Sequence, residues 1–202
     1  MIIHDIQQCT EEWLKVRLGK VTASRFSDVM AKGAGKTRKS YMIQLAAEIM
    51  TGEPQNGYSS AAMEWGTEQE PFARQYYETI HDCPVEQVGF IELNEWVGVS
   101  PDGLVGADGD VEIKCPNTST HIATILADKV PTTHKPQIQG QLWVTDRKWC
   151  DFISYDPRMK QRPFFCKRVM RDEAYIKELE IQVTMFVTEL KEMIEKLTVN
   201  EF

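Results

Sequence analysis

The sequence predicts an α/β fold, because helical and strand patterns both recur along its 202 residues. Residues 111–114 alternate apolar and polar side chains, a pattern typical of a short strand. Residues 173–197 place apolar side chains at helical spacing and predict a long terminal helix. No internal repeat interrupts the pattern, and the length suits one domain over residues 1–202 with a core of its own.

The remaining elements follow from capping residues, glycines and turn dipeptides. We expect helices over 12–19, 22–30 (capped at 22–24), 40–51, 61–80, 118–128, 131–145 and 173–197. We expect strands over 85–93, 96–100, 149–155 and 164–170, and a further strand unit over 102–114 that continues the same sheet. Pro71 predicts a kink or a helix start near Glu70, and Asp108-Gly109 predicts a tight turn.

Composition excludes several classes of protein. The 42% hydrophobic and 26% charged residues are ordinary for a globular protein, and no apolar run is long enough to span a membrane. We expect no signal peptide, and five scattered Cys without a CxxC pair suit reduced thiols in a cytoplasm. The net charge of −7 argues against nucleic acid binding over the whole surface but allows a local basic groove.

The chemistry centres on Ser100-Pro101-Asp102-Gly103 and Val111-Glu112-Ile113-Lys114. The predicted turn places Asp102 and Glu112 on neighbouring strands, and period-two alternation puts Glu112 and Lys114 on one polar face. Two carboxylates suit a hard cation such as Mg²⁺, which polarises a phosphoryl oxygen and activates water. The Lys can orient that water or help to deprotonate it, and can offset charge on the phosphate. From the pattern alone, an Asp at a turn followed by a surface Glu/Lys pair without a metal is an equally good interpretation.

Three other stretches have both a functional and an ordinary interpretation. Arg17 ahead of the Thr22-Ala23-Ser24 cap would suit a phosphate, or would be a solvated Arg beside a capped helix. The Gly- and Lys-rich loop 32–39 could contact a DNA backbone or could simply be a solvated loop. It is not an ATP-binding Walker loop, because that motif needs a Gly at position 30 and this sequence has Met30. Gln137 could orient the attacking water or lie exposed on its helix.

Several stretches together resemble a known family. They are Trp13 to Gly19 with Thr22-Ala23-Ser24, Trp65 to Glu70, Ser100 to Gly103, Glu112 to Pro116, Gln137-Ile138-Gln139 and Tyr155 to Met159. In this order they resemble the YqaJ-type viral recombinase nucleases, the family of phage lambda exonuclease within the PD-(D/E)xK superfamily. The resemblance covers roughly positions 10 to 200.

The resemblance implies a PD-(D/E)xK core, a mixed β-sheet flanked by helices. It implies an Mg²⁺-dependent 5′→3′ exonuclease that acts on double-stranded DNA ends. For the mechanism we expect two metals that clamp the attacking and leaving oxygens, and the sequence does not decide whether Mn²⁺ replaces Mg²⁺. It further implies a homotrimeric ring, a single-strand annealing protein as partner, and a phage or prophage enzyme in a bacterial cytoplasm.

The resemblance also assigns roles to residues. Asp102, Glu112 and the Ile113 carbonyl would bind metal, Glu70 would complete that site, and Lys114 and Gln137 would serve catalysis. The 5′-phosphate and DNA would contact Arg17, Ser24, Lys36, Arg38 and Met63. Met63 stands where the family places an apolar wedge against the terminal base pair, although core packing explains it equally well.

Two other functions remain open on the same fold. An endonuclease would need no pocket for an end phosphate, so Arg17 and Ser24 argue against it. A non-catalytic scaffold that binds DNA ends would not need Asp102, Glu112 and Lys114 together, so the presence of all three argues against it.

Overall fold

A computed structural model describes residues 1–31, 36–55 and 61–199. Its helices are α1 (Glu11–Arg17), α2 (Phe26–Val29), α3 (Lys36–Thr51), α4 (Ala61–His81), α5 (Thr118–Ala127), α6 (Lys135–Thr145) and α7 (Glu173–Thr198), with short 3₁₀ helices at Ala23–Arg25 and Thr132–His134. Its strands are β1 (Ile2–His4), β2 (Val21–Thr22), β3 (Phe90–Asn94), β4 (Val97–Val99), β5 (Gly103–Val105), β6 (Gly109–Lys114), β7 (Trp149–Tyr155) and β8 (Phe164–Met170). The α/β prediction is confirmed.

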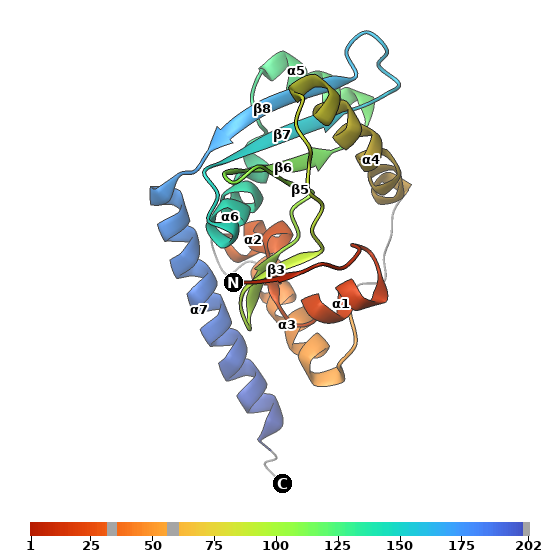
Figure 1. The fold of residues 1–202 in the computed structure, drawn as a ribbon. Coiled ribbons are helices and arrows are strands. Elements are labelled where there is room, and N and C mark those ends of the chain that lie inside the picture. Colours follow the sequence, from red (N-terminus) through yellow and green to blue (C-terminus); the bar gives the residue numbers. More distant parts are fainter. Residues whose placement is uncertain (32–35, 56–60, 200–202) are drawn as a thin grey trace.

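The strands form two mixed sheets rather than the single sheet expected. The first has the order β1-β3-β4-β2, in which β2 and β4 are parallel and the other pairs antiparallel. The second has the order β5-β6-β7-β8, with only β6 and β7 parallel. In Figure 1 the second sheet lies with α4 and α5 in the upper half, and the first lies below it with α1, α2 and α3. The predicted continuation of the hairpin sheet into β5 was wrong, because β5 pairs with β6 in the second sheet and meets the segment before β3 through an isolated bridge between Glu86 and Leu104.

Helix α6 connects the two sheets and packs against both. The predicted core positions Ile138 and Leu142 are buried, but so are Gln139, Gly140 and Gln141 on the other sides of the helix. Such burial on nearly every side explains why the apolar pattern of α6 is weak. Helix α7 packs against α2, α3 and α6 and runs down one side of the molecule in Figure 1.

Local capping fixes where several helices begin. The side chains of Thr10, Asn117 and Asp172 accept hydrogen bonds from the backbone N–H groups of the first turns of α1, α5 and α7. The predicted helix over 61–80 is confirmed as α4, which continues through Pro71, so of the two alternatives expected there a helix start near Glu70 is excluded. No helix in the described ranges is both long and apolar enough to cross a membrane.

Gly140 sets the approach of α6 to Phe26 of α2. A Cβ at position 140 would lie 2.2 Å from Cδ2 of the Phe26 ring, which is fully buried. We expect Gly140→Ala to lower the free energy of unfolding by about 1–3 kcal/mol, because the helix or the ring must move. Gly66 of α4 meets nothing within 4 Å, so Gly66→Ala is the matched control and should not destabilise the protein. Thermal unfolding of both variants checks this, and equal melting temperatures would contradict it.

Candidate active site

Asp102 is held at the start of the second sheet. It directly precedes β5, and its Oδ2 accepts a hydrogen bond of 2.6 Å from the backbone N–H of Ile113 in β6. Arg74 of α4 donates to the Asp102 carbonyl at 3.2 Å, and Gln8 donates to the Pro101 carbonyl at 2.9 Å. The expected juxtaposition of Asp102 with the strand that carries Glu112 is therefore present.

Glu112 is fully buried on β6 and has a separate partner for each carboxylate oxygen. Its Oε1 forms an ion pair with the Lys114 ammonium, and its Oε2 accepts a hydrogen bond of 2.5 Å from Nε2 of Gln141. Glu112 and Lys114 lie together on one polar face, as expected, and the alternative interpretation as a surface Glu/Lys pair is wrong because Glu112 is buried. Because β6 lies between β5 and β7 and packs against α4, every residue of the strand except Lys114 is buried.

Glu70 reaches this cluster from α4, where its side chain is paired with Arg74 one turn along the helix. Gln137 is half-buried one turn before Gln141, and its side chain forms no hydrogen bond to any residue that the structure describes. The amide that contacts Glu112 is therefore that of Gln141, which the sequence did not single out.

Burial and mutual repulsion dominate the electrostatics of the three carboxylates. Burial raises the pKa of Asp102 well above its ordinary value, and the charges of Glu112 and Glu70 raise it further. Burial also raises the pKa of Glu70, against the opposing effect of Arg74. Burial acts to lower the pKa of Lys114, but Glu112 and Asp102 outweigh it and raise the pKa, so the amine stays protonated.

This donor set fits a hard divalent cation. Carboxylate oxygens and a backbone carbonyl are the ligands that Mg²⁺ prefers, and a cation would relieve the repulsion that raises the pKa of Asp102. No three His, Cys, Asp or Glu side chains in the described ranges converge closely enough to form a complete metal cage. Asp102 and Glu112 are the carboxylates that would form the core of such a site, whereas the Glu70 side chain is paired with Arg74.

A cavity of about 490 Å³ opens beside these residues, within the usual range for ligand pockets. Met63, Gly66, Thr67 and Glu70 of α4 form one wall, together with Asp102 and Lys114. The lining also includes Thr120, Thr124, His134, Phe152 and Ser154. His134 was not predicted; its ring stacks on Phe152 with centroids 5.2 Å apart, and burial and the charge of Lys114 lower its pKa.

Arg17 and Ser24 line a second, positively charged pocket, which also contains Lys20, Arg25 and Glu48. The Arg17 guanidinium lies 3.8 Å from the Trp13 ring centroid and donates to Ser100 Oγ at 3.2 Å. Burial lowers the pKa of Arg17 to about 10, which leaves it charged at neutral pH. The expected helix after Ser24 is only a 3₁₀ turn followed by the four-residue α2, so the pocket depends on side chains and not on a helix dipole.

The two pockets are neighbours. Ser100, which receives the hydrogen bond from Arg17, is two residues before Asp102. Burial raises the pKa of the Cys9 thiol, and the charge of Glu70 raises it further, whereas the charge of Arg17 lowers it. Cys9 is therefore close enough to interact electrostatically with one residue from each pocket. The contact between Arg17 and Ser100 was not predicted, because only the fold brings the two segments together.

Comparison with known proteins decides the family. The model of the YqaJ-like viral recombinase domain matches residues 12–148 of this chain. The chain belongs to that family. A search of curated proteins gave no match.

Solved structures agree with membership of the YqaJ-like family. The alkaline exonuclease LHK-Exo of Laribacter hongkongensis is 47% identical over 93% of this chain and 96% of its own, with a TM-score of 0.88. The same enzyme in complex with dAMP matches equally well, at 48% identity. A phage-related exonuclease of Haemophilus somnus 129PT shares the fold at 17% identity and a TM-score of 0.71, over 89% of this chain and 96% of its own.

The predicted DNA contacts Lys36 and Arg38 lie outside both pockets of this YqaJ-like chain. Residues 36–39 form the first turn of α3 and not a loop, and residues 32–35 lie outside the described ranges. Arg38 forms a bidentate ion pair with Glu189 of α7, at 2.6 and 2.9 Å, and covers the Phe186 ring. Its visible role is to join α3 to α7, whereas Lys36 is exposed.

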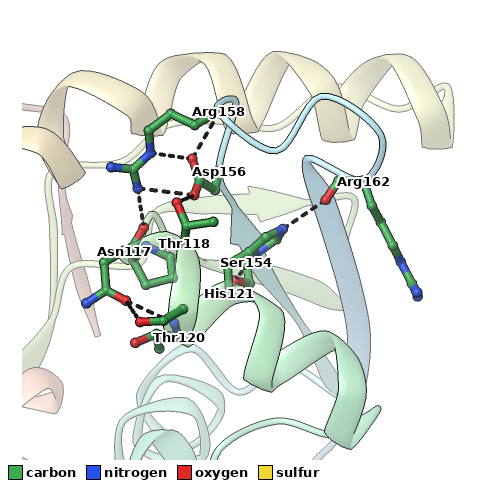
Figure 2. A network of polar contacts seen from close by, with 10 residues as sticks. Asn117, Thr118, Thr120, His121, Ser154, Asp156, Arg158 and Arg162 are labelled. Carbon is green, nitrogen blue, oxygen red and sulfur yellow. Dashed lines mark hydrogen bonds and ion pairs between the residues drawn. The ribbon is translucent and has the colours of Figure 1, made fainter.

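Figure 2 shows a polar network around Asp156 and Arg158, which contacts Pro116 in the lining of the cavity beside Asp102. Asp156 is fully buried and accepts hydrogen bonds from Thr118 Oγ1 and from the Arg158 side chain. Arg158 also donates to the Pro116 carbonyl and covers the Trp65 ring of α4. Burial acts to raise the pKa of Asp156, but the hydrogen bonds from Arg158 and Thr118 outweigh it and lower the pKa. The network therefore joins the loop after β7 to the segment that follows Lys114.

We expect Asp110 to make the protein less stable as the pH rises. It is fully buried on β6, and burial, with a smaller contribution from Glu112, raises its pKa to about 7. Because an unfolded Asp titrates near pH 4, the fold binds this proton more tightly than the unfolded chain does. Between pH 4 and 7 we expect this group to lower the free energy of unfolding by about 4 kcal/mol, a loss that is complete above pH 7.

Asp110→Asn tests this pH dependence. The variant should gain stability relative to the wild type as the pH rises from 5 to 8, as measured by denaturant unfolding at each pH. Asp82 is exposed with a φ of 47°, a conformation that Asn tolerates, so Asp82→Asn is the control and should follow the wild type. Parallel pH profiles for Asp110→Asn and the wild type would contradict the assignment.

Proposed function

We propose that this chain is an Mg²⁺-dependent 5′→3′ exonuclease that digests one strand of linear duplex DNA from its 5′-phosphorylated end. Membership of the YqaJ-like family and 47% identity to an alkaline exonuclease support a nuclease of the phage type. The observation that carries the finer proposal is the basic Arg17 pocket, which adjoins the carboxylate cluster through Ser100 and Asp102.

In this proposal Asp102, Glu112 and the Ile113 carbonyl hold Mg²⁺, with Glu70 as a further ligand and room for two ions. Bound Mg²⁺, or Mn²⁺ in its place, supplies the Lewis acid that activates water and polarises the scissile phosphate. Lys114 stays protonated beside Glu112, so it orients the water and offsets charge on the phosphate rather than taking a proton. Gln137 supports this geometry from the same face of α6 as Gln141.

The Arg17 pocket gives the reaction its end specificity. A 5′-phosphate bound by Arg17, with Ser24 and Ser100 close by, would fix the terminal nucleotide relative to the carboxylates. Met63, which is 58% exposed and lines the catalytic pocket, would contact the terminal base pair. Lys36 and Arg38 would contact the DNA backbone, although for Arg38 this requires release from Glu189.

The assembly and partner follow from the family resemblance. We propose a homotrimeric ring around DNA and a single-strand annealing protein that receives the 3′ overhang, in a bacterial cytoplasm. Exposed apolar residues of α7, such as Ile181 and Met185, are available for a contact of this kind.

The test compares linear duplex with covalently closed circular duplex of the same sequence in the presence of Mg²⁺. We expect the linear DNA to lose one strand and the circle to remain intact. Cleavage of the circle would assign an endonuclease, and binding of linear ends without digestion would assign a non-catalytic scaffold.

A further inference from the structure

Gln141 is placed to hold the carboxylate on which the proposed metal site depends. Its side chain is fully buried, and Nε2 donates to Glu112 Oε2 at 2.5 Å. A carboxylate only accepts hydrogen bonds, so the amide must present its nitrogen to Glu112. This orientation fixes the rotamer of Gln141 as well as that of Glu112.

The same orientation leaves the carbonyl oxygen of the Gln141 amide in an unfavourable environment. Its Oε1 is buried and has no hydrogen-bond partner among the described residues. An unpaired buried carbonyl is destabilising, so Gln141 is poorly explained as a residue that only stabilises α6. Leucine or methionine would fill the same volume without that cost.

The two partners of Glu112 differ in how firmly they are held. Gln141 is enclosed in the core on α6, whereas the Lys114 side chain is 33% exposed beside the cavity. Oε1 has the Lys114 ammonium as its ionic partner but no hydrogen bond of good geometry among the described residues. Oε1 is therefore the oxygen that can turn to a cation, while Oε2 remains fixed by Gln141.

We propose that Gln141 is a positioning residue, which binds Oε2 of Glu112 so that Oε1 is presented to Mg²⁺. This inference rests on the proposed function, because it assumes that Glu112 is a metal ligand. Partners that orient metal ligands commonly change metal affinity or activity by about 10–100-fold when they are removed.

Gln139 provides a matched control on the same helix. It is also buried, at 1% exposure, but its amide donates to the Met170 carbonyl and accepts from the Asp172 N–H. Replacement by methionine thus removes two hydrogen bonds at Gln139 and one at Gln141, and only the bond at Gln141 involves Glu112. A purely structural role would affect the two variants alike.

The experiment titrates Mg²⁺ into the wild type, Gln141→Met and Gln139→Met by calorimetry without DNA, and records melting temperatures. We expect Gln141→Met to bind Mg²⁺ about 10–100-fold more weakly and to need correspondingly more Mg²⁺ for half-maximal digestion of linear duplex. Gln139→Met should lose melting temperature but keep the wild-type Mg²⁺ affinity.

Equal Mg²⁺ affinity in Gln141→Met and the wild type would overturn the inference, as would an equal loss in both variants. If Gln141→Met does not fold, Gln141→Ser, whose hydroxyl is too short to reach Glu112, gives the same comparison. A wild type that binds Mg²⁺ but digests no DNA would refute the proposed nuclease activity, while the binding titration would still decide the role of Gln141.

Discussion

Lys114→Ala should reduce the rate of Mg²⁺-dependent digestion of linear duplex by about 10²–10⁴-fold. Lys114 forms an ion pair with Glu112, lines the catalytic cavity and keeps its charge because Glu112 and Asp102 raise its pKa. It is the only cationic side chain among the described residues that line this cavity. Without it, nothing in that lining offsets the charge that develops on the phosphate.

The same substitution also removes the ionic partner of Glu112, and an unpaired buried carboxylate costs roughly 3–5 kcal/mol of stability. Digestion must therefore be measured well below the melting temperature of the variant. Lys129 is exposed on the segment that follows α5, so Lys129→Ala controls for the loss of one positive charge. Lys114→Ala with wild-type digestion would remove Lys114 from the mechanism.

Arg17→Ala should abolish the preference for a 5′-phosphate. A hydrogen bond to a charged group contributes about 1.5–3 kcal/mol, which corresponds to about 10–150-fold in binding. We expect kcat/KM on 5′-phosphorylated duplex to fall by this factor, while the rate on 5′-hydroxyl duplex changes little. The loss should appear mainly in KM, because Arg17 lies outside the carboxylate cluster.

Lys15 of α1 is exposed and outside the pocket, so Lys15→Ala is the control on the same helix. It removes the same charge and should retain the preference for phosphorylated ends. If Arg17→Ala still discriminates between the two ends, the 5′-phosphate binds elsewhere and the Arg17 pocket has a structural role.

The second sheet was predicted better than the first, for physical reasons. The bounds of β7 and β8 agree with the prediction, and the Asp108-Gly109 turn correctly places β5 beside β6. Strands β1 and β2 have three and two residues, too short for alternation to be recognised, so they were missed. The division into two sheets depends on long-range packing through α6, which no local pattern records.

The candidate site was predictable where its residues are close in sequence. Glu112 and Lys114 share a strand, so their proximity follows from period two alone. The contacts of Gln141 with Glu112 and of Arg17 with Ser100 join segments 29 and 83 residues apart, so they required the fold. Gln137 and Gln141 lie one turn apart, and sequence alone could not show which amide meets the carboxylate.

The most direct test of the proposed function measures from which end a strand of linear duplex is digested in the presence of Mg²⁺. Two duplexes of one sequence would be compared, one with 5′-phosphates and one with 5′-hydroxyl ends, each labelled on one strand at the 5′ or the 3′ end. We predict early release of the 5′ label and late release of the 3′ label from the phosphorylated duplex. The duplex with 5′-hydroxyl ends should be digested slowly. Early release of the 3′ label, or equal digestion of the two duplexes, would contradict a 5′→3′ exonuclease anchored at Arg17.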